Sequence, residues 1–412
     1  METYLDSKID SKCFGCEACA QICPKYAIVM KKNNEGFRYP EIDESKCIHC
    51  NLCRKVCPYN NMPPKNQEMQ YAWGGYHKDW EIRNTSTSGG AFSAIVDAFC
   101  DDNYIIFGAT ANGLEVFHTY VEDKHKMQIF RKSKYLQSNI RESYIEVRKF
   151  LQEGKKVLFS GTPCQIAGLK TFLQNEKIDN LLTVEVICEG VPSPYYMKKY
   201  EQYLKKNYSS PIKTIDYRYT DGKKSGCKER GKWDFEIMKI EFENGKEIKK
   251  DRWINPFWQV WLNHLMSRPS CYNCKFTTSE RIADITLGDL WGVHLYCPEL
   301  YGKNGGASLV ICNSKKGKKV FEKAKENLYG HELDFELAKK YQSPLRKSIS
   351  TNPKRKEFMD DLLNNEIDYK KLCKKWYKKP SLKLLFSKYI WGNRQKIWLW
   401  NLKNKWGGNR NE

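Results

Sequence analysis

The 412-residue sequence predicts an α/β (α+β) main domain, preceded by a small cysteine-rich domain and followed by a basic helical C-terminal tail. Three observations support this fold class. Cysteines recur in a duplicated pattern near the N-terminus, short apolar strands alternate with helices in the middle, and lysines and tryptophans dominate the end. We expect the domain boundaries at 1–62 for the cysteine-rich domain, 63–70 for a linker, 71–333 for the main domain and 334–412 for the tail.

The composition predicts a folded protein of two or three domains. Hydrophobic residues make up 41% of the chain and aromatic residues 13%, which excludes wholesale disorder. The net charge of +21 is concentrated in the tail, which argues against nucleic-acid binding by the whole chain. We expect a cytoplasmic protein, because neither a signal peptide nor a membrane span is visible. In a reducing compartment, 17 cysteines imply that most of them bind metal.

Each half of the N-terminal repeat has the pattern C-x2-C-x2-C-x3-C-P. In such a repeat three thiolates of one run bind one cubane, and the fourth reaches across to the other cluster. The spacing therefore predicts two 4Fe-4S clusters, the first held by Cys13, Cys16, Cys19 and Cys57 and the second by Cys47, Cys50, Cys53 and Cys23. Zinc sites and disulfides are the alternatives, but zinc sites use cysteine pairs with longer gaps. Residues 8–60 resemble a bacterial dicluster ferredoxin, which implies one-electron transfer.

The main domain begins near Tyr71 and alternates two kinds of element. Apolar runs predict strands over residues 104–109, 115–121, 156–160, 181–187, 214–219, 234–242 and 307–312. Longer periodic segments predict helices over residues 91–100, 140–152, 164–173, 255–266 and 315–326. This alternation favours a sheet that is flanked by helices.

Four cysteines of the main domain are candidates for a further metal site. Cys164 and Cys188 each follow an expected strand, and Cys271 and Cys274 form a C-x2-C loop. Because the carboxyl ends of strands form the ligand crevice of an α/β sheet, these four thiols are candidates for a third 4Fe-4S cluster. Alternatively, Cys164 and Cys188 are core residues and only the C-x2-C loop binds a metal such as zinc. The other cysteines are expected to be core or surface thiols: Cys100, Cys227, Cys297, Cys312 and Cys373.

Six motifs of the main domain occur in the order found in a known family. They are Thr87-Ser88-Gly89-Gly90, Lys134-Tyr135-Leu136-Gln137-Ser138, Gly161-Thr162-Pro163-Cys164-Gln165, Cys188-Glu189-Gly190-Val191-Pro192, Cys271-Tyr272-Asn273-Cys274 and Asp284-Ile285-Thr286-Leu287-Gly288-Asp289-Leu290-Trp291-Gly292. On these motifs, residues 70–330 resemble the coenzyme F-420 hydrogenase/dehydrogenase beta-subunit family, which includes the 7-hydroxymethyl chlorophyll a reductases. The resemblance implies a flavoprotein domain in which the four main-domain cysteines hold a 4Fe-4S cluster beside an FAD.

Three segments offer candidate flavin-binding residues. The first segment is a glycine turn before an apolar helix and contains Ser88, Gly89 and Gly90. It suits the FAD pyrophosphate; alternatively, it is an ordinary N-cap and turn. The second segment contains a cation, an aromatic ring and two polar groups: Lys134, Tyr135, Gln137 and Ser138. These groups suit the flavin ring or an incoming cofactor; alternatively, the segment is a surface loop. Asp289 lies in a turn beside Trp291 that suits the junction of cluster and flavin, or is structural. No nicotinamide fingerprint or phosphate-binding loop is present, so any hydride chemistry comes from the flavin, or there is none.

The sequence thus predicts an FAD-dependent iron-sulfur oxidoreductase that moves electrons between the ferredoxin-type clusters, a third cluster and FAD, coupled to hydride transfer. Its expected redox partner is a ferredoxin or a hydride-donor cofactor, while the substrate and the catalytic residues stay unassigned. The alternative is a non-catalytic electron-transfer subunit that docks to the inner membrane surface or a partner complex. Docking would use the basic tail, where Trp391, Trp398, Trp400 and Trp406 alternate with cations; packing of the tail on its own domain is the competing interpretation.

Overall fold

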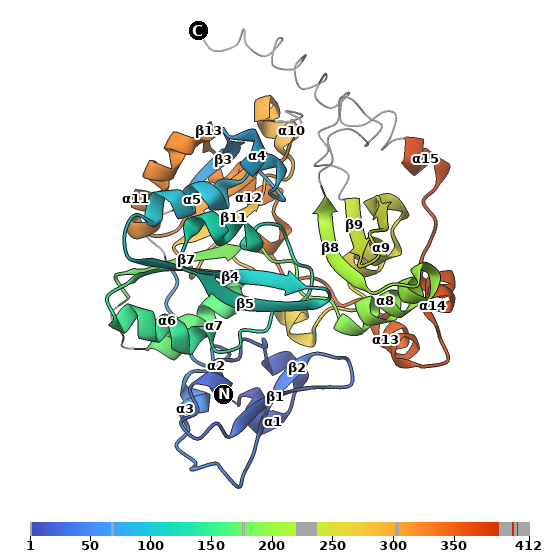
Figure 1. The fold of residues 1–412 in the computed structure, drawn as a ribbon, viewed down its shortest axis with the longest axis horizontal. Helices are drawn as coiled ribbons and strands as arrows, with labels where there is room; N and C mark the ends of the chain where they lie inside the picture. Colours follow the sequence, from blue (N-terminus) through green and yellow to red (C-terminus); the bar gives the residue numbers. More distant parts are fainter. Residues whose placement is uncertain are drawn as a thin grey trace.

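The structure is a computed structural model, which describes residues 2–66, 70–174, 176, 178–219, 237–300, 305–386, 398 and 402. Figure 1 shows an N-terminal domain against one side of a large helix-covered sheet, with a smaller sheet and its helices beside them. Within the described residues, no helix combines the length and apolar character that crossing a membrane requires.

The N-terminal domain is a two-stranded hairpin with short helices. The hairpin pairs β1 (Ile28–Lys32) with β2 (Arg38–Ile42) in antiparallel register. The two cysteine runs lead into matching one-turn helices, α2 (Ala18–Gln21) and α3 (Leu52–Lys55). The residues that precede these helices, Glu17 and Asn51, both adopt a left-handed conformation, so the sequence repeat is also a structural repeat.

The main sheet is mixed, and helices flank it, as the alternation of helices and strands predicts. Its eight strands follow the order β13-β3-β12-β11-β7-β6-β4-β5, and the central strands β4, β6, β7 and β11 run parallel. The remaining pairs are antiparallel. The strand bounds are β3 (Tyr71–His77), β4 (Tyr104–Asn112), β5 (Glu115–Val121), β6 (Lys156–Gly161), β7 (Leu181–Val186), β11 (Ile285–Asp289), β12 (Ser308–Cys312) and β13 (Leu328–Leu333).

Helices cover both faces of this sheet (Figure 1). On β6, Leu158 belongs to the core under α5 (Ala91–Phe99) and α11 (Lys315–Ala324), whereas Val157 and Phe159 belong to the core under α6 (Ser143–Gln152) and α7 (Pro163–Leu173). Strand side chains alternate between faces, which produces this division. The second core also includes Phe14, Cys16 and Val56, so the N-terminal domain packs on the α6–α7 face.

The smaller sheet has the order β10-β9-β8, with β8 (Ile212–Tyr219), β9 (Ile237–Phe242) and β10 (Glu247–Lys250). Its core is aromatic and includes Trp258 of α9 (Pro256–Leu262) and side chains of α8 (Pro194–Tyr208). Two helices of the segment expected as a tail join this core, α13 (Arg355–Leu363) and α14 (Tyr369–Trp376). After α15 (Leu382–Leu385), the tryptophan-rich tail lies outside the described residues except for Phe386, Trp398 and Leu402.

Candidate functional site

The fold brings the four main-domain cysteines to one place. Strands β6 and β7 are parallel neighbours, so their carboxyl ends lie side by side. Cys164 is the second residue of α7, directly after β6, and Cys188 follows β7. Cys271 lies in the short helix η5 (Pro269–Asn273) and Cys274 ends it. All four cysteines line one cavity, together with Pro344, Lys347 and Ile349.

Burial raises the pKa values of these four cysteines, and the charges of neighbouring thiols add to this effect at Cys188, Cys271 and Cys274. Burial raises the pKa of Cys271 to about 11 and that of Cys274 to about 12, and the charge of Cys164 adds to both effects. Burial also raises the pKa of Cys164 and Cys188. Buried thiols of this kind stay protonated unless a cation stabilises their thiolates. Four convergent sulfurs in a largely apolar cavity are a donor set that fits a 4Fe-4S cluster.

The first predicted cluster set of the N-terminal domain also converges. The pKa of Cys16 is raised well above its usual range by burial, and the charges of Cys57 and Cys13 add to it. Burial also raises the pKa of Cys19 well above its usual range, and the charges of Cys16, Cys13 and Cys57 add to this effect. The fourth cysteine of the second run therefore lies with the first three cysteines of the first run, as the crossed ligand pattern requires.

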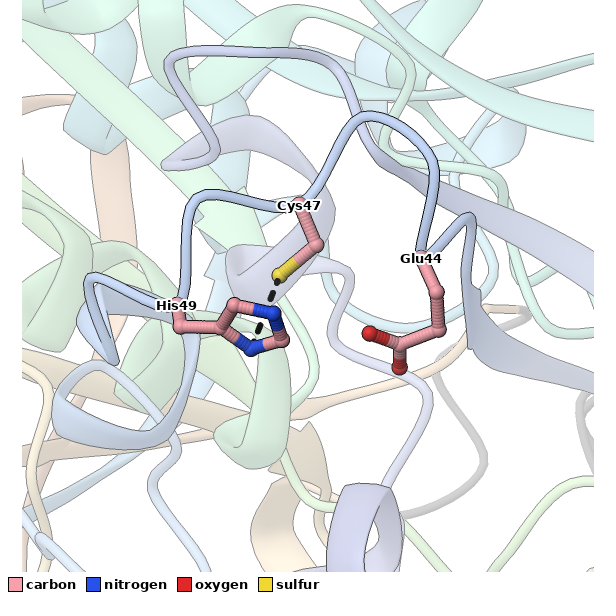
Figure 2. A group of neighbouring side chains, drawn as sticks. All are labelled: Glu44, Cys47 and His49. Carbon is pink, nitrogen blue, oxygen red and sulfur yellow. Dashed lines mark hydrogen bonds between the residues drawn. The ribbon is translucent and has the colours of Figure 1, made fainter.

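The second predicted set lies at the outer side of the domain. Cys50 is exposed, and Cys23, Cys47 and Cys53 are partly exposed. The Ala27 N–H donates to Cys23 Sγ at 3.3 Å, a contact of the kind that tunes cluster potentials. Figure 2 shows the His49 ring facing Cys47, with Nδ1 3.9 Å from Sγ, and Glu44 beside them. Sequence reasoning assigned no role to His49.

The first cysteine set adjoins the cavity of the main domain. Phe14, which lies between Cys13 and Cys16, lines the cavity itself. A methyl group added at Gly168 of α7 would lie 3.0 Å from Cys16 Sγ, and α7 is the helix that begins beside Cys164. The charges of Cys16 and Cys164 influence each other. The two thiol sites are therefore neighbours.

Arg268 connects the two thiol sites. Its side chain is 1% exposed and donates to the carbonyl oxygens of Cys13 and Arg38 and to Gln137 Oε1, each at 3.0 Å. Gln137 donates in turn to the Phe14 carbonyl at 2.9 Å. Gln137, predicted as a flavin contact, thus lies between the two thiol sites. Sequence reasoning missed Arg268, and its position directly before Pro269 and the C-x2-C loop was the available signal.

Ser138 lies near Gln137 in a buried polar chain. It contacts His118 Nδ1 at 2.9 Å and accepts a hydrogen bond from Gln165 Nε2 at 2.8 Å. Gln165 also accepts from the Thr162 N–H at 2.9 Å, which caps the start of α7. The chain therefore fixes the turn that carries Cys164.

The other predicted flavin residues make contacts within the protein. Ser88 Oγ donates to the Ala307 carbonyl at 2.6 Å, and the Gly89 N–H donates to Ser308 Oγ at 2.9 Å. Gly90 is the left-handed N-cap of α5. Lys134 Nζ donates to three carbonyl oxygens that end the helix η2 (Lys124–Phe130), the nearest at 2.8 Å.

These segments nevertheless approach one another around the end of β8. The N–H of Ser133, directly before Lys134, donates to Oγ1 of Thr87, directly before Ser88, at 2.8 Å, which brings two of the predicted segments together. Lys132 forms an ion pair with Asp216, and Arg218 forms a buried ion pair with Asp289. Asp216 and Arg218 lie on β8, so one strand connects the second segment with the third.

Comparisons with known proteins give two family matches. Residues 154–336 match the model for the C terminus of the coenzyme F420 hydrogenase/dehydrogenase beta subunit, and residues 12–61 match the model described as 4Fe-4S dicluster domain. No curated protein matches the chain. Among solved structures, a chain of the F420-reducing [NiFe] hydrogenase complex from Methanosarcina barkeri, determined as a xenon derivative, has 17% identity and a TM-score of 0.42. That alignment covers 71% of this chain and 99% of the other.

Proposed function

Because residues 154–336 belong to the coenzyme F420 hydrogenase/dehydrogenase beta-subunit family and residues 12–61 to the 4Fe-4S dicluster domains, we propose that the chain is an FAD-dependent iron-sulfur oxidoreductase. We call the first predicted set (Cys13, Cys16, Cys19 and Cys57) the inner set and the second (Cys47, Cys50, Cys53 and Cys23) the outer set. In this function electrons pass between the outer cluster, the inner cluster, a third 4Fe-4S cluster and FAD. The flavin supplies the coupling between one-electron transfer and hydride transfer when it is bound.

One observation carries the proposal: the inner cysteine set and the cavity of the main domain share their wall. Phe14 contributes to that cavity, and Arg268 contacts the Cys13 carbonyl while lining it. The outer set, in contrast, has the exposed Cys50. The three thiol sites therefore form a sequence from the surface of the N-terminal domain into the main domain, which is the arrangement that an electron relay needs.

The third site is proposed to use Cys164, Cys188, Cys271 and Cys274 as ligands. Cys164 Sγ lies 3.2 Å from Thr162 Oγ1, within hydrogen-bond distance. The positive charge of Arg268 lies near enough to lower the pKa of both Cys164 and Cys271, against the larger effect of burial. Hydrogen bonds to sulfur and a nearby cation stabilise the extra electron of a reduced cluster.

The proposed flavin region lies where the predicted segments meet β8. Tyr135 packs its ring 5.4 Å from Tyr217, 4.9 Å from Trp258 and 5.0 Å from Trp261. Within the described residues, the Tyr217 hydroxyl and the two indole N–H groups are buried without a hydrogen-bond partner. Buried donors of this kind normally have an acceptor, and the oxygen and nitrogen atoms of a flavin are acceptors. This observation supports FAD binding near Tyr135.

The test is a count of iron, acid-labile sulfide and flavin in the full chain, purified without oxygen. We expect about twelve irons and one FAD per chain, as three 4Fe-4S clusters require. Cys188→Ser should lower the count to about eight irons. Cys312→Ser, a buried cysteine of β12, is the matched control and should leave the count unchanged.

Three further outcomes bear on the proposal. Reduction of the bound flavin by a soluble hydride donor, followed by appearance of reduced clusters, would support the enzyme. Eight irons without flavin, unaffected by Cys188→Ser, would contradict it and leave a dicluster ferredoxin fused to a domain without redox cofactors. Flavin that is reduced only through a partner protein would favour the non-catalytic electron-transfer subunit instead.

A further inference from the structure

Another group of metal-ligating side chains lies apart from the three proposed cluster sites and includes Cys297, which was expected from the sequence to be a core or surface thiol. Cys297 Sγ lies 3.3 Å from Glu299 Oε1 and 3.2 Å from His331 Nε2. The distance between His331 Nε2 and Glu299 Oε1 is 3.2 Å. Three different ligand types thus place one atom each at the corners of a nearly equilateral triangle.

The fold holds each of the three residues in place. Cys297 ends the short helix α10 (Val293–Tyr296), where its N–H donates to the Val293 carbonyl at 2.7 Å. Glu299 lies in the following turn η6 (Pro298–Leu300), whose Leu300 N–H donates to the Cys297 carbonyl at 3.1 Å. His331 lies on the edge strand β13, opposite Gly74 of β3. The triangle therefore joins a loop to the rim of the main sheet.

We propose that Cys297, Glu299 and His331 bind a divalent zinc-type metal ion, with a fourth ligand from solvent. Tetrahedral Zn²⁺ with about 2.3 Å to sulfur and about 2.0–2.1 Å to nitrogen or oxygen separates its ligand atoms by about 3.3–3.6 Å. The observed sides of 3.2 and 3.3 Å need to expand by only a few tenths of an ångström.

A metal can take the place of the hydrogen bonds within this group. A neutral thiol carries one proton, so Cys297 can donate to Glu299 or to His331 but not to both. On binding, that proton passes to solvent, and the thiolate and carboxylate charges balance the metal charge.

One of the three proposed ligands is buried, and the other two are exposed to solvent. The Cys297 side chain is buried at 1% exposure, whereas the side chains of Glu299 and His331 are 53% and 46% exposed. The ion therefore enters from the Glu299 and His331 side and reaches the thiol without unfolding the loop. This site is independent of the proposed electron-transfer function, because none of its ligands belongs to a predicted cluster.

The experiment uses the full chain with its iron-sulfur clusters. The protein is dialysed without oxygen against buffered Zn²⁺, and zinc and iron are counted by mass spectrometry. We expect one zinc per wild-type chain, and at least tenfold weaker zinc binding in His331→Ala and in Glu299→Gln. His125→Ala alters an exposed histidine on another element and is the control. The iron count should be equal in all four proteins, which shows that the variants fold.

X-ray absorption at the zinc edge identifies the ligands independently of affinity. One sulfur at about 2.3 Å and three nitrogen or oxygen atoms at about 2.0 Å would support the site. Four sulfur ligands would place the zinc in a cysteine cluster site and overturn the proposal. Wild-type protein that retains no zinc, or His331→Ala that retains as much as wild type, would also overturn it.

Discussion

Arg268 Nε donates to the carbonyl oxygen of Cys13 at 3.0 Å, which ties the main domain to the first cysteine run of the N-terminal domain. The same guanidinium influences the thiols of Cys164 and Cys271 on its other side. One buried positive charge thus lies between two proposed clusters, and both clusters gain a negative charge on reduction.

Replacing this charge should lower the midpoint potentials of both neighbouring clusters. We expect a decrease on the order of 60 mV in Arg268→Gln, equivalent to a tenfold change in a one-electron equilibrium. Arg268→Lys keeps the charge and should shift the potentials less. Redox titration followed by electron paramagnetic resonance measures the effect, with Lys156→Gln as a distant surface control. Unchanged potentials in an iron-replete Arg268→Gln protein would contradict this role.

Gly15 should not tolerate a side chain, because Gln137 and Arg268 crowd it. This crowding can be tested separately from the effect of its positive φ. It has a φ of +67°, and a methyl group there would lie 2.7 Å from Gln137 Nε2 and 2.9 Å from Arg268 Nη1. Gly154 has a φ of +77° but open space around it. Alanine at either position costs about 1 kcal/mol for the backbone. Gly15→Ala should lose more unfolding free energy than Gly154→Ala and should also lose iron; equal losses would rule out the proposed crowding.

The sequence alone predicts most of the regular elements of the main domain. Apolar runs such as residues 156–160 and 181–187 identify central strands because both faces of these strands are buried. It does not reveal β3, with its two glycines, or β13, whose side chains are mainly exposed, because neither has a clear apolar pattern. The helices α13 and α14 fall in a lysine-rich segment, where the few core side chains, such as Phe358 and Leu372, are widely spaced.

Candidate ligands are easier to predict than the contacts between domains. Cysteine spacing reflects the local geometry of a cluster, so the N-terminal sets can be assigned before any fold is known. Arg268, Gln137 and Phe14 meet because two domains dock, and no local pattern encodes docking. The trio of Cys297, Glu299 and His331 is equally hidden, since its histidine comes from a distant strand.

His118 should make the stability of the chain depend on pH in mild acid. Burial lowers its pKa from 6.5 to about 4, and Nε2 contacts the Ser160 carbonyl at 3.0 Å. Between these two values the unfolded chain binds a proton that the folded chain does not, so stability rises with pH and is fully present above 6.5. The slope is at most about 1.4 kcal/mol per pH unit.

Urea unfolding between pH 5 and 7.5, followed by circular dichroism, measures this slope. His118→Gln cannot titrate, so its unfolding free energy should change less with pH than that of wild type. His125→Gln alters an exposed histidine and should keep the wild-type slope. A His118→Gln slope as steep as that of wild type would show that other groups cause the acid sensitivity.

His49 should affect the outer cluster alone. It occupies the place in the second cysteine run that Gly15 occupies in the first, and both residues have a positive φ, +52° and +67°. His49→Gly therefore removes the imidazole beside Cys47 Sγ while it relieves the backbone. Loss of a donor to sulfur lowers a cluster potential. We expect a lower potential for one cluster, unchanged potentials for the others and unchanged or higher stability, measured by redox titration and thermal unfolding. A shift in the inner cluster would show that the outer and inner sets are assigned the wrong way round.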